Sequence, residues 1–208
     1  MFMIKAVYGL PGSGKTTLLS VAAYKWNHGK SFLGIPPAKT VFTNFAMPGC
    51  YKLDFNALGL FNFCDCNIII DEIMLLCDCR AYKNFPDHLR DFFALHRRSR
   101  TNVLWCSQSW GDTDLKIKNL TEEYFLLEKC PVFSFLSIVK PIDKDLGIGK
   151  KGDVYKIASP LFWYFLYRPK WYHLFDSYES YLHSLPPVEL EMWDNFVDSP
   201  NQPLDKSA

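Results

Sequence analysis

The sequence predicts an α/β fold in which a mainly parallel central sheet is flanked by helices. Short apolar runs, such as the three isoleucines of "NIIID" (residues 67–71), alternate along the chain with segments of helical periodicity. Continuous apolar runs are typical of parallel strands that are covered by helices on both faces. A glycine-rich segment also joins the first apolar run directly to a helical pattern. The 208 residues, 49% of them hydrophobic, suit a core of this kind.

The first half of the chain carries most of the expected core elements. Apolar runs there indicate buried strands, and amphipathic patterns indicate helices that cover the sheet. We expect strands at residues 3–8, 40–45, 67–71 and 102–108, and helices at residues 17–26 and 87–98.

The last third of the chain has a different composition. Residues 123–128 and 132–139 predict two further strands. The segment "GIGKKGDVYKI" (147–157) predicts a C-terminal β-hairpin with its turn at residues 150–153. An aromatic-rich segment follows at residues 162–175, and such segments more often form core or a subunit interface than a platform on which bases stack.

Charge and composition argue against membrane-spanning, exported and disulfide-rich proteins. The net charge is +1, so any contact with nucleic acid must come from local basic residues. We find no run near the roughly 20 apolar residues of a membrane-spanning helix, and no pattern of an export signal. The seven cysteines lack the spacing of a disulfide scaffold, which favours a reducing cytoplasm. We expect one domain over residues 1–180 and a partly disordered C-terminal extension over residues 181–208.

The glycine-rich segment is "GLPGSGKT" (residues 9–16), which matches the phosphate-binding pattern G-x-x-x-x-G-K-[ST] in full. Because it follows a strand and opens a helix, its backbone N–H groups and the positive end of the helix dipole face phosphate oxygens. Lys15 is expected to reach the β- and γ-phosphates, and Thr16 to hold Mg²⁺ through its hydroxyl. The predicted nucleotide-binding residues are Gly9, Pro11, Gly12, Ser13, Gly14, Lys15, Thr16 and Thr17.

An acidic pair ends the apolar run at residues 67–71. Asp71 is expected at the carboxyl edge of its strand, where the crevice of an open α/β sheet lies. We interpret Asp71 as the acid on the magnesium side and Glu72 as the base that orients a water for attack. Since water is then the acceptor, the pair favours ATP hydrolysis over phosphorylation of a small molecule.

Gln108 is a further polar residue at the end of an expected buried strand, 102–108. It could sense the γ-phosphate or position the attacking water. A plain role in capping the following turn is equally supported by the residues alone.

Five segments together resemble the N-terminal domain of the zonular occludens toxin (Zot) family, in order and approximate spacing: "GLPGSGKT", "VFTNF", "IIIDE", "HRRSRTNVLWCSQ" and "LFDSYES". This family includes filamentous-phage assembly ATPases and is similar to FtsK–HerA-type DNA pumps. The resemblance covers most of residues 1–180. It implies a P-loop fold in which the strand of Gln108 lies between the phosphate-loop strand and the strand of Asp71 and Glu72, so that Gln108 reaches the γ-phosphate.

The resemblance also implies partners. It suggests a homo-oligomeric ring that acts on viral DNA without sequence preference, in the cytoplasm of a host cell. The phage assembly proteins continue into a membrane span and an outer domain, for which this sequence shows no candidate. We therefore expect either membrane attachment through a partner at the inner membrane, or a role beside a viral coat.

The basic cluster "HRRSR" (residues 96–100) has three interpretations. Its cations could stabilise the negative end of a helix dipole or contact DNA phosphates. Alternatively, Arg97, Arg98 or Arg100 could act as an arginine finger that reaches the nucleotide of a neighbouring subunit.

Two cysteine pairs, Cys64 with Cys66 and Cys77 with Cys79, raise the alternative of a zinc site. Buried free thiols are the favoured interpretation, because a strand separates the pairs and C-x-C is a weak ligand spacing. The predicted function is thus an ATP-hydrolysing motor, with Mg²⁺, for assembly, export or packaging of viral or mobile-element DNA. The alternative is a non-motor interaction protein that binds nucleotide to control assembly of a coat or secretion complex.

Overall fold

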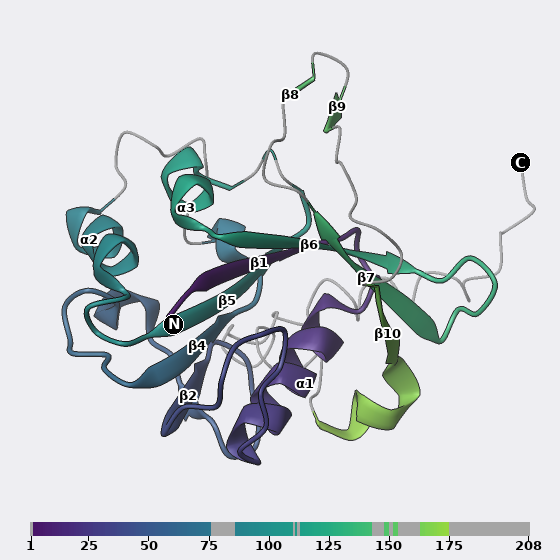
Figure 1. Ribbon diagram of the computed structural model, residues 1–208, viewed down its shortest axis with the longest axis horizontal. Helices are drawn as coiled ribbons and strands as arrows, with labels where there is room; N and C mark the ends of the chain where they lie inside the picture. The colour runs from purple at the N-terminus through teal and green to yellow at the C-terminus, as the bar shows by residue number, and fades with distance from the viewer. Residues whose placement is uncertain are drawn as a thin grey trace, which may run out of the picture. The chain divides into compact units, whose positions relative to one another are not determined.

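The described part of the chain contains one sheet of eight strands. Their bounds are β1 (Ile4–Tyr8), β2 (Thr40–Thr43), β3 (Tyr51–Lys52), β4 (Cys66–Ile70), β5 (Asn102–Ser107), β6 (Glu123–Lys129), β7 (Leu136–Ile142) and β10 (Tyr164–Tyr167). Their spatial order is β10-β7-β6-β1-β5-β4-β2-β3 (Figure 1). The helices are α1 (Lys15–Asn27), α2 (Asp87–Leu95) and α3 (Leu115–Leu120), with 3₁₀ turns η1 (Phe55–Ala57), η2 (Ile73–Leu75) and η5 (Arg168–Leu174).

The computed structural model describes residues 2–75, 86–109, 111, 113–142, 148–149, 152–153 and 163–174. All of these residues belong to one compact unit, residues 1–177. The expected extension at 181–208 lies outside the described residues, so the domain boundary at residue 180 stays a prediction. Within the described residues, no helix combines the length and apolar character that a membrane span requires.

Most of the sheet is parallel, which confirms the predicted fold class. The pairs β2–β3, β2–β4, β4–β5, β5–β1 and β1–β6 are parallel. The last two strands differ, since β7 pairs antiparallel with β6, and β10 pairs antiparallel with β7. Strand β5 lies between β1 and β4, as the Zot resemblance implies.

Helices cover both faces of the sheet, so alternate residues of each strand enter two different cores. On one face, Leu18 and Ala22 of α1 pack with Val7, Ile69 and Leu104 from the central strands. On the other face, residues of α2 and α3 pack with the intervening strand residues; these include Leu89, Phe93, Ile117, Ile4, Ile68 and Trp105. All five residues of β1 and of β4 are buried, which explains why these strands are apolar apart from Lys5 and Asn67.

Several boundaries differ from the expected ones. The strand expected at 132–139 begins only at Leu136, because the preceding residues form the turn of the β6–β7 hairpin, in which the N–H of Cys130 donates to the carbonyl of Leu136 (3.0 Å). Phe133 and Phe135 in this turn are exposed. The strand was predicted to begin too early because both residues are hydrophobic. The short strand β3 and helix α3 were not predicted.

A C-terminal hairpin is present in the described residues. Strands β8 (Ile148–Gly149) and β9 (Gly152–Asp153) pair antiparallel, with Gly149 opposite Gly152. The expected turn at 150–153 is therefore wrong, since Gly152 and Asp153 belong to a strand.

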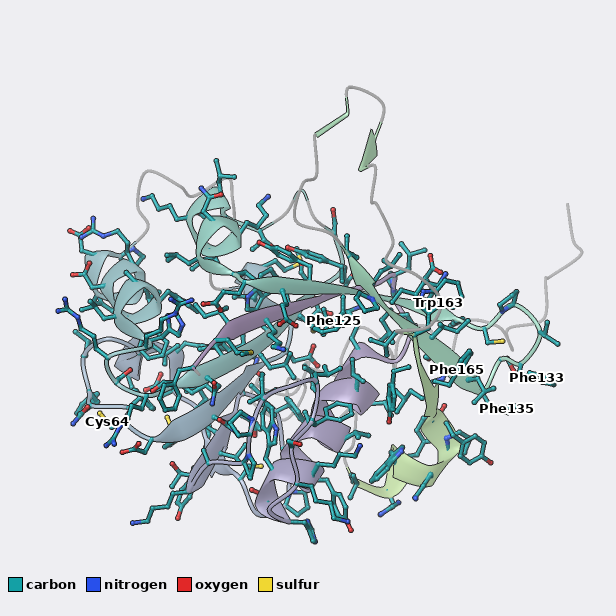
Figure 2. The ribbon with its side chains drawn as sticks, viewed as in Figure 1. Cys64, Phe125, Phe133, Phe135, Trp163 and Phe165 are labelled. Carbon is teal, nitrogen blue, oxygen red and sulfur yellow. The ribbon has the colours of Figure 1, made fainter. Side chains whose placement is uncertain are left out.

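The aromatic-rich segment, expected as core or interface, forms β10 and η5. In β10, Leu166 is buried, whereas Phe165 and Tyr167 are exposed. Figure 2 labels Phe165 of β10 and Phe133 and Phe135 of the β6–β7 turn, and the rings of Phe135 and Tyr167 meet edge to face at 5.7 Å. One face of this segment thus completes the core and the other leaves aromatic rings exposed.

Candidate functional site

The phosphate loop turns sharply between β1 and α1 because two of its glycines adopt left-handed backbone conformations. Gly12 has φ 71° and Gly14 has φ 98°, values that other residues rarely adopt. Gly14 is the N-cap of α1 and has no side chain to cap the first turn of the helix. The first N–H groups of α1 are therefore left for an anion, which is what the G-x-x-x-x-G-K-[ST] pattern predicts.

Lys15 is held inside the loop. Its side chain is 6% exposed, and its ammonium donates to the carbonyl oxygen of Gly9 at 2.9 Å. Gly9 itself packs against β6, where an added Cβ would lie 2.5 Å from the carbonyl oxygen of Leu127. The loop is thus pre-formed, with a buried cation at its centre that suits a polyphosphate.

Thr16 and Asp71 lie in direct contact at the carboxyl edge of the sheet. The Thr16 hydroxyl donates to Asp71 Oδ2 at 2.6 Å. Asn44, which follows β2, braces Asp71 from the other side: its amide donates to the Asp71 carbonyl (2.8 Å) and its Oδ1 accepts from the Asp71 N–H (2.7 Å). The hydroxyl and the carboxylate are oxygen donors of the type that Mg²⁺ prefers, so this pair fits the expected ion.

A thiol also contacts the Asp71 carboxylate. Cys106, the fifth residue of β5, donates from Sγ to Asp71 Oδ1 at 2.7 Å. Burial, and secondarily the neighbouring carboxylate of Asp71, raise the pKa of Cys106 well above its usual range. The thiol therefore remains protonated at neutral pH and acts as a hydrogen-bond donor that orients Asp71.

Glu72 and Gln108 meet because β4 and β5 are neighbours. Gln108 Nε2 donates to Glu72 Oε1 at 3.0 Å, while Glu72 Oε2 is buried and has no hydrogen-bond partner among the described residues. Glu72 has φ 51°, a left-handed conformation that typically costs on the order of 1–3 kcal/mol in residues other than glycine. Such strain often marks functional positions, and Glu72 lines the same pocket as the phosphate loop.

One pocket of about 390 Å³ brings these residues together. It is lined by Pro11, Gly12, Gly14, Lys15, Thr16, Thr17, Glu72, Gln108, Arg168 and Tyr172. Gly9 and Asp71 accept hydrogen bonds from the lining residues Lys15 and Thr16. Ser13 is buried, and its carbonyl accepts a hydrogen bond from Ser137 at 2.5 Å. The volume lies in the range of small-molecule sites.

Two residues of this pocket, Arg168 and Tyr172, were not predicted from the sequence. Both belong to η5, which follows the edge strand β10 and lies beside α1 (Figure 1). The signal that was available is weak: a cation directly after the aromatic run "FWYFLY", at the point where Pro169 ends the strand.

The basic cluster lies at the opposite edge of the sheet from the pocket. Arg100 precedes β5 and Gln108 follows it, and six strand residues at about 3.3 Å each separate them by about 20 Å. Arg97 pairs with Glu122 at 2.5 Å, and Arg100 pairs with Asp65 at 2.6 Å. Within one chain, the cluster therefore does not reach the pocket, and a role as a finger would require a neighbouring subunit.

The cysteines do not form a metal site in the part of the chain that the structure describes, where no group of three or more metal-binding side chains occurs. Cys66 is buried in β4, and burial raises its pKa to about 11. Cys64 is exposed and donates to Asn62. Cys77 and Cys79 lie outside the described residues.

Comparison with known proteins adds a curated relative. No protein-family model matches the chain. The chain is 32% identical over 129 residues, 60% of its length, to the movement protein TGB1 of Potato mop-top virus. The match covers only 27% of the length of that movement protein.

Solved structures show where else this fold occurs. The N-terminal domain of zonular occludens toxin from Neisseria meningitidis superposes with a TM-score of 0.53 over 85% of this chain and 100% of that domain, at 17% identity. The genome packaging NTPase B204 of Sulfolobus turreted icosahedral virus 2, in complex with ATP-gammaS, gives a TM-score of 0.46 at 13% identity, over 76% of this chain and 97% of that one. The resemblance on which the sequence analysis relied is confirmed by the strand order and the superposition, and this chain has the P-loop fold of the zonular occludens toxin N-terminal domain.

Proposed function

We propose that this chain hydrolyses ATP, with Mg²⁺, to drive the assembly, export or packaging of viral or mobile-element DNA. The observation that carries the proposal is the hydrogen bond between Gln108 and Glu72 across the pocket from Lys15 and Thr16. A carboxylate and an amide on the open side of a phosphate loop suit the positioning of a water for attack on the γ-phosphoryl group.

Each residue then has a distinct task. Lys15 and the N–H groups of the loop bind the β- and γ-phosphates. Thr16 and Asp71 would hold a magnesium ion, which would neutralise charge at the phosphates. Glu72 is the base that orients the attacking water, and Gln108 fixes the Glu72 carboxylate through Oε1.

The viral context has separate support. The curated relative is a viral movement protein, and it shares 32% identity with this chain over the matched residues. The sequence resemblance to the Zot family supports a ring-forming motor that acts on DNA, in the cytoplasm of a host cell. With a net charge of +1, binding to DNA must depend on local basic surface and on ring formation.

The experiment that tests the proposal measures continuous ATP turnover by the purified chain with and without DNA of unrelated sequences. We expect turnover that DNA stimulates, and DNA binding that weakens steeply with salt because phosphate contacts release counterions. A Glu72→Gln variant provides the blank for contaminating ATPases. Slow turnover that DNA does not change would favour the alternative, a nucleotide-gated protein that controls assembly of a coat or secretion complex.

A further inference from the structure

The segment formed by β10 and η5 adds a second wall to the phosphate pocket. Strand β10 pairs with β7 so that Tyr167 lies opposite Leu136, and the N–H of Arg168 donates to the carbonyl of Phe135 at 3.1 Å. This pairing fixes the backbone of Arg168 beside the loop. The chain then turns through η5, which brings Tyr172 to the same pocket four residues later.

The Arg168 side chain lies against the loop itself. Its Nη1 donates to the carbonyl of Gly12 at 3.1 Å, and its Nη2 donates to the carbonyl of Ser134. Its aliphatic stem packs on Gly14, where an added Cβ would lie 2.8 Å from Arg168 Cδ. Arg168 therefore touches the two loop glycines whose left-handed conformations shape the phosphate site.

Arg168 lines the pocket, and one donor of its guanidinium lacks a partner among the described residues. Nε of Arg168 is buried and has no hydrogen-bond partner among the described residues. Leaving a charged donor unpaired in a buried position is costly, so its presence at a pocket wall indicates an acceptor that arrives with the ligand. A guanidinium presents its donors in a planar fork that matches the oxygens of phosphate.

We propose that Arg168 binds the polyphosphate of the nucleotide within the same chain, opposite Lys15, and that the ring of Tyr172 contacts its nucleoside. This inference rests on the proposed function, in that it takes the pocket to bind a nucleoside triphosphate. Tyr172 is 50% exposed and lines the pocket together with Thr17, beyond the loop glycines. An aromatic ring in that place can stack on a base or pack on a ribose.

The experiment compares ATP with inorganic tripolyphosphate, a probe that has the phosphates and no nucleoside. Calorimetric titration of the full chain with each probe gives two affinities for every variant. Arg168→Met retains the aliphatic stem on Gly14 and removes the charge, and we expect it to weaken both probes about 10- to 100-fold. Tyr172→Ala should lower the affinity for ATP and leave the affinity for tripolyphosphate unchanged. Tyr172→Phe, which keeps the ring, should retain the wild-type affinity for ATP.

Lys170→Ala is the matched control. It removes one positive charge from the same turn, at a residue that is exposed and does not line the pocket. We expect it to leave both affinities unchanged. Equal losses in Lys170→Ala and Arg168→Met would show a general effect of charge and would overturn the assignment of Arg168.

A purely structural role for Arg168 gives a different result. If Arg168 only braced the carbonyls of Gly12 and Ser134, its loss would lower the affinity for both probes. The salt dependence of tripolyphosphate binding would then stay unchanged. If it binds phosphate, Arg168→Met should show a smaller slope of affinity against salt. Should Arg168→Met fail to fold, Arg168→Lys decides, because a lysine that reproduced wild-type affinity for both probes would contradict a fork-like contact.

Mixing separates an arginine that acts within its own chain from one that acts on a neighbour. Arg168→Met mixed with Lys15→Ala should regain no ATPase activity, because every site then lacks one of the two cations. Activity regained on mixing would overturn the inference. A wild-type chain that bound neither ATP nor tripolyphosphate would instead refute the proposed function, so the two failures are distinguishable.

Discussion

The parallel and antiparallel parts of the sheet contribute to the pocket in different ways. In the parallel part, β1, β4 and β5 end at one edge, and the residues directly after them supply the loop, Glu72 and Gln108. In the antiparallel part, Arg168 reaches the loop only because β10 pairs with β7, which pairs with β6. The first contribution can be read from short motifs, and the second depends on long-range strand pairing.

The basic cluster at residues 96–100 lies at the end of the sheet opposite the pocket. The first prediction, which has the largest expected effect, tests whether this cluster acts on the pocket of a neighbouring subunit. Among the described residues, Arg97 and Arg100 have acidic partners, whereas no ion pair involves Arg98. Of the three, we expect Arg98 to be the finger, and Arg98→Ala to lower ATP hydrolysis by roughly 10³–10⁵, the range seen for arginine fingers. Mixing Arg98→Ala with Lys15→Ala should restore activity, in contrast to Arg168→Met.

The same mixing experiment with Arg97→Ala and Arg100→Ala completes this test. Specific activity of the wild-type chain should also rise with protein concentration, because a finger acts only in an oligomer. If no position in the cluster recovers activity on mixing, the cluster serves the helix end or DNA instead.

The second prediction separates binding from hydrolysis within the parallel part. Lys15→Ala should weaken ATP binding because the buried ammonium is lost from the loop. Glu72→Gln should bind ATP as wild type and hydrolyse it about 10²–10⁴ times more slowly, the usual contribution of a general base. Equal loss of ATP affinity in both variants, measured by titration, would assign Glu72 to binding.

The sequence predicted the parallel part well because its signals are local. Largely apolar runs placed β1, β4 and β5, and the Zot resemblance implied that the strand of Gln108 lies between the phosphate-loop strand and the strand of Asp71 and Glu72, as observed. The hydrogen bond between Asn44 and Asp71 was not predicted, although Asn44 lies in the quoted segment "VFTNF". The segment alone does not predict which backbone groups the side-chain amide of Asn44 will contact.

The antiparallel part was predicted less well for a physical reason. The aromatic run before Arg168 has no clean period, because one face of β10 is buried at Leu166 while exposed rings lie on the other. Its partner β7 begins four residues later than expected, after the exposed Phe133 and Phe135. Without that register, the position of Arg168 beside Gly12 could not be derived.

The third prediction concerns the brace on Asp71. Asn44→Ala removes two hydrogen bonds and leaves the N–H and carbonyl of Asp71 without their partner. We expect the free energy of unfolding to fall by about 1–3 kcal/mol and the magnesium concentration needed for ATPase activity to rise. Asn27→Ala, at a residue whose amide makes one exposed contact with Cys50, is the control. Unchanged stability and magnesium dependence in Asn44→Ala would show that Asp71 is positioned by other contacts.

The fourth prediction, with the smallest expected effect, concerns the pH dependence of stability that the buried thiol of Cys66 in β4 causes. Burial raises the pKa of Cys66 to about 11. A folded-state pKa above the unfolded value means that the unfolded chain loses this proton first, so stability is complete below about pH 8.5 and falls as the pH rises towards the folded pKa. Between pH 9 and 10, Cys66→Ala should flatten the fall by about 1.4 kcal/mol per pH unit in denaturant titrations. An unchanged slope in Cys66→Ala would show that the Cys66 thiol is not shielded from water.

The hydrogen bond from Arg168 to Gly12 joins residues that are 156 positions apart, and the one from Ser137 to Ser13 joins residues 124 positions apart. During synthesis, the complete phosphate motif therefore leaves the ribosome long before the strands that support it. Contacts of such long range form late in folding, because the whole intervening chain must first be ordered. If the pocket binds ATP as proposed, we therefore expect a fragment that ends before β10 to bind it more weakly than the finished domain does.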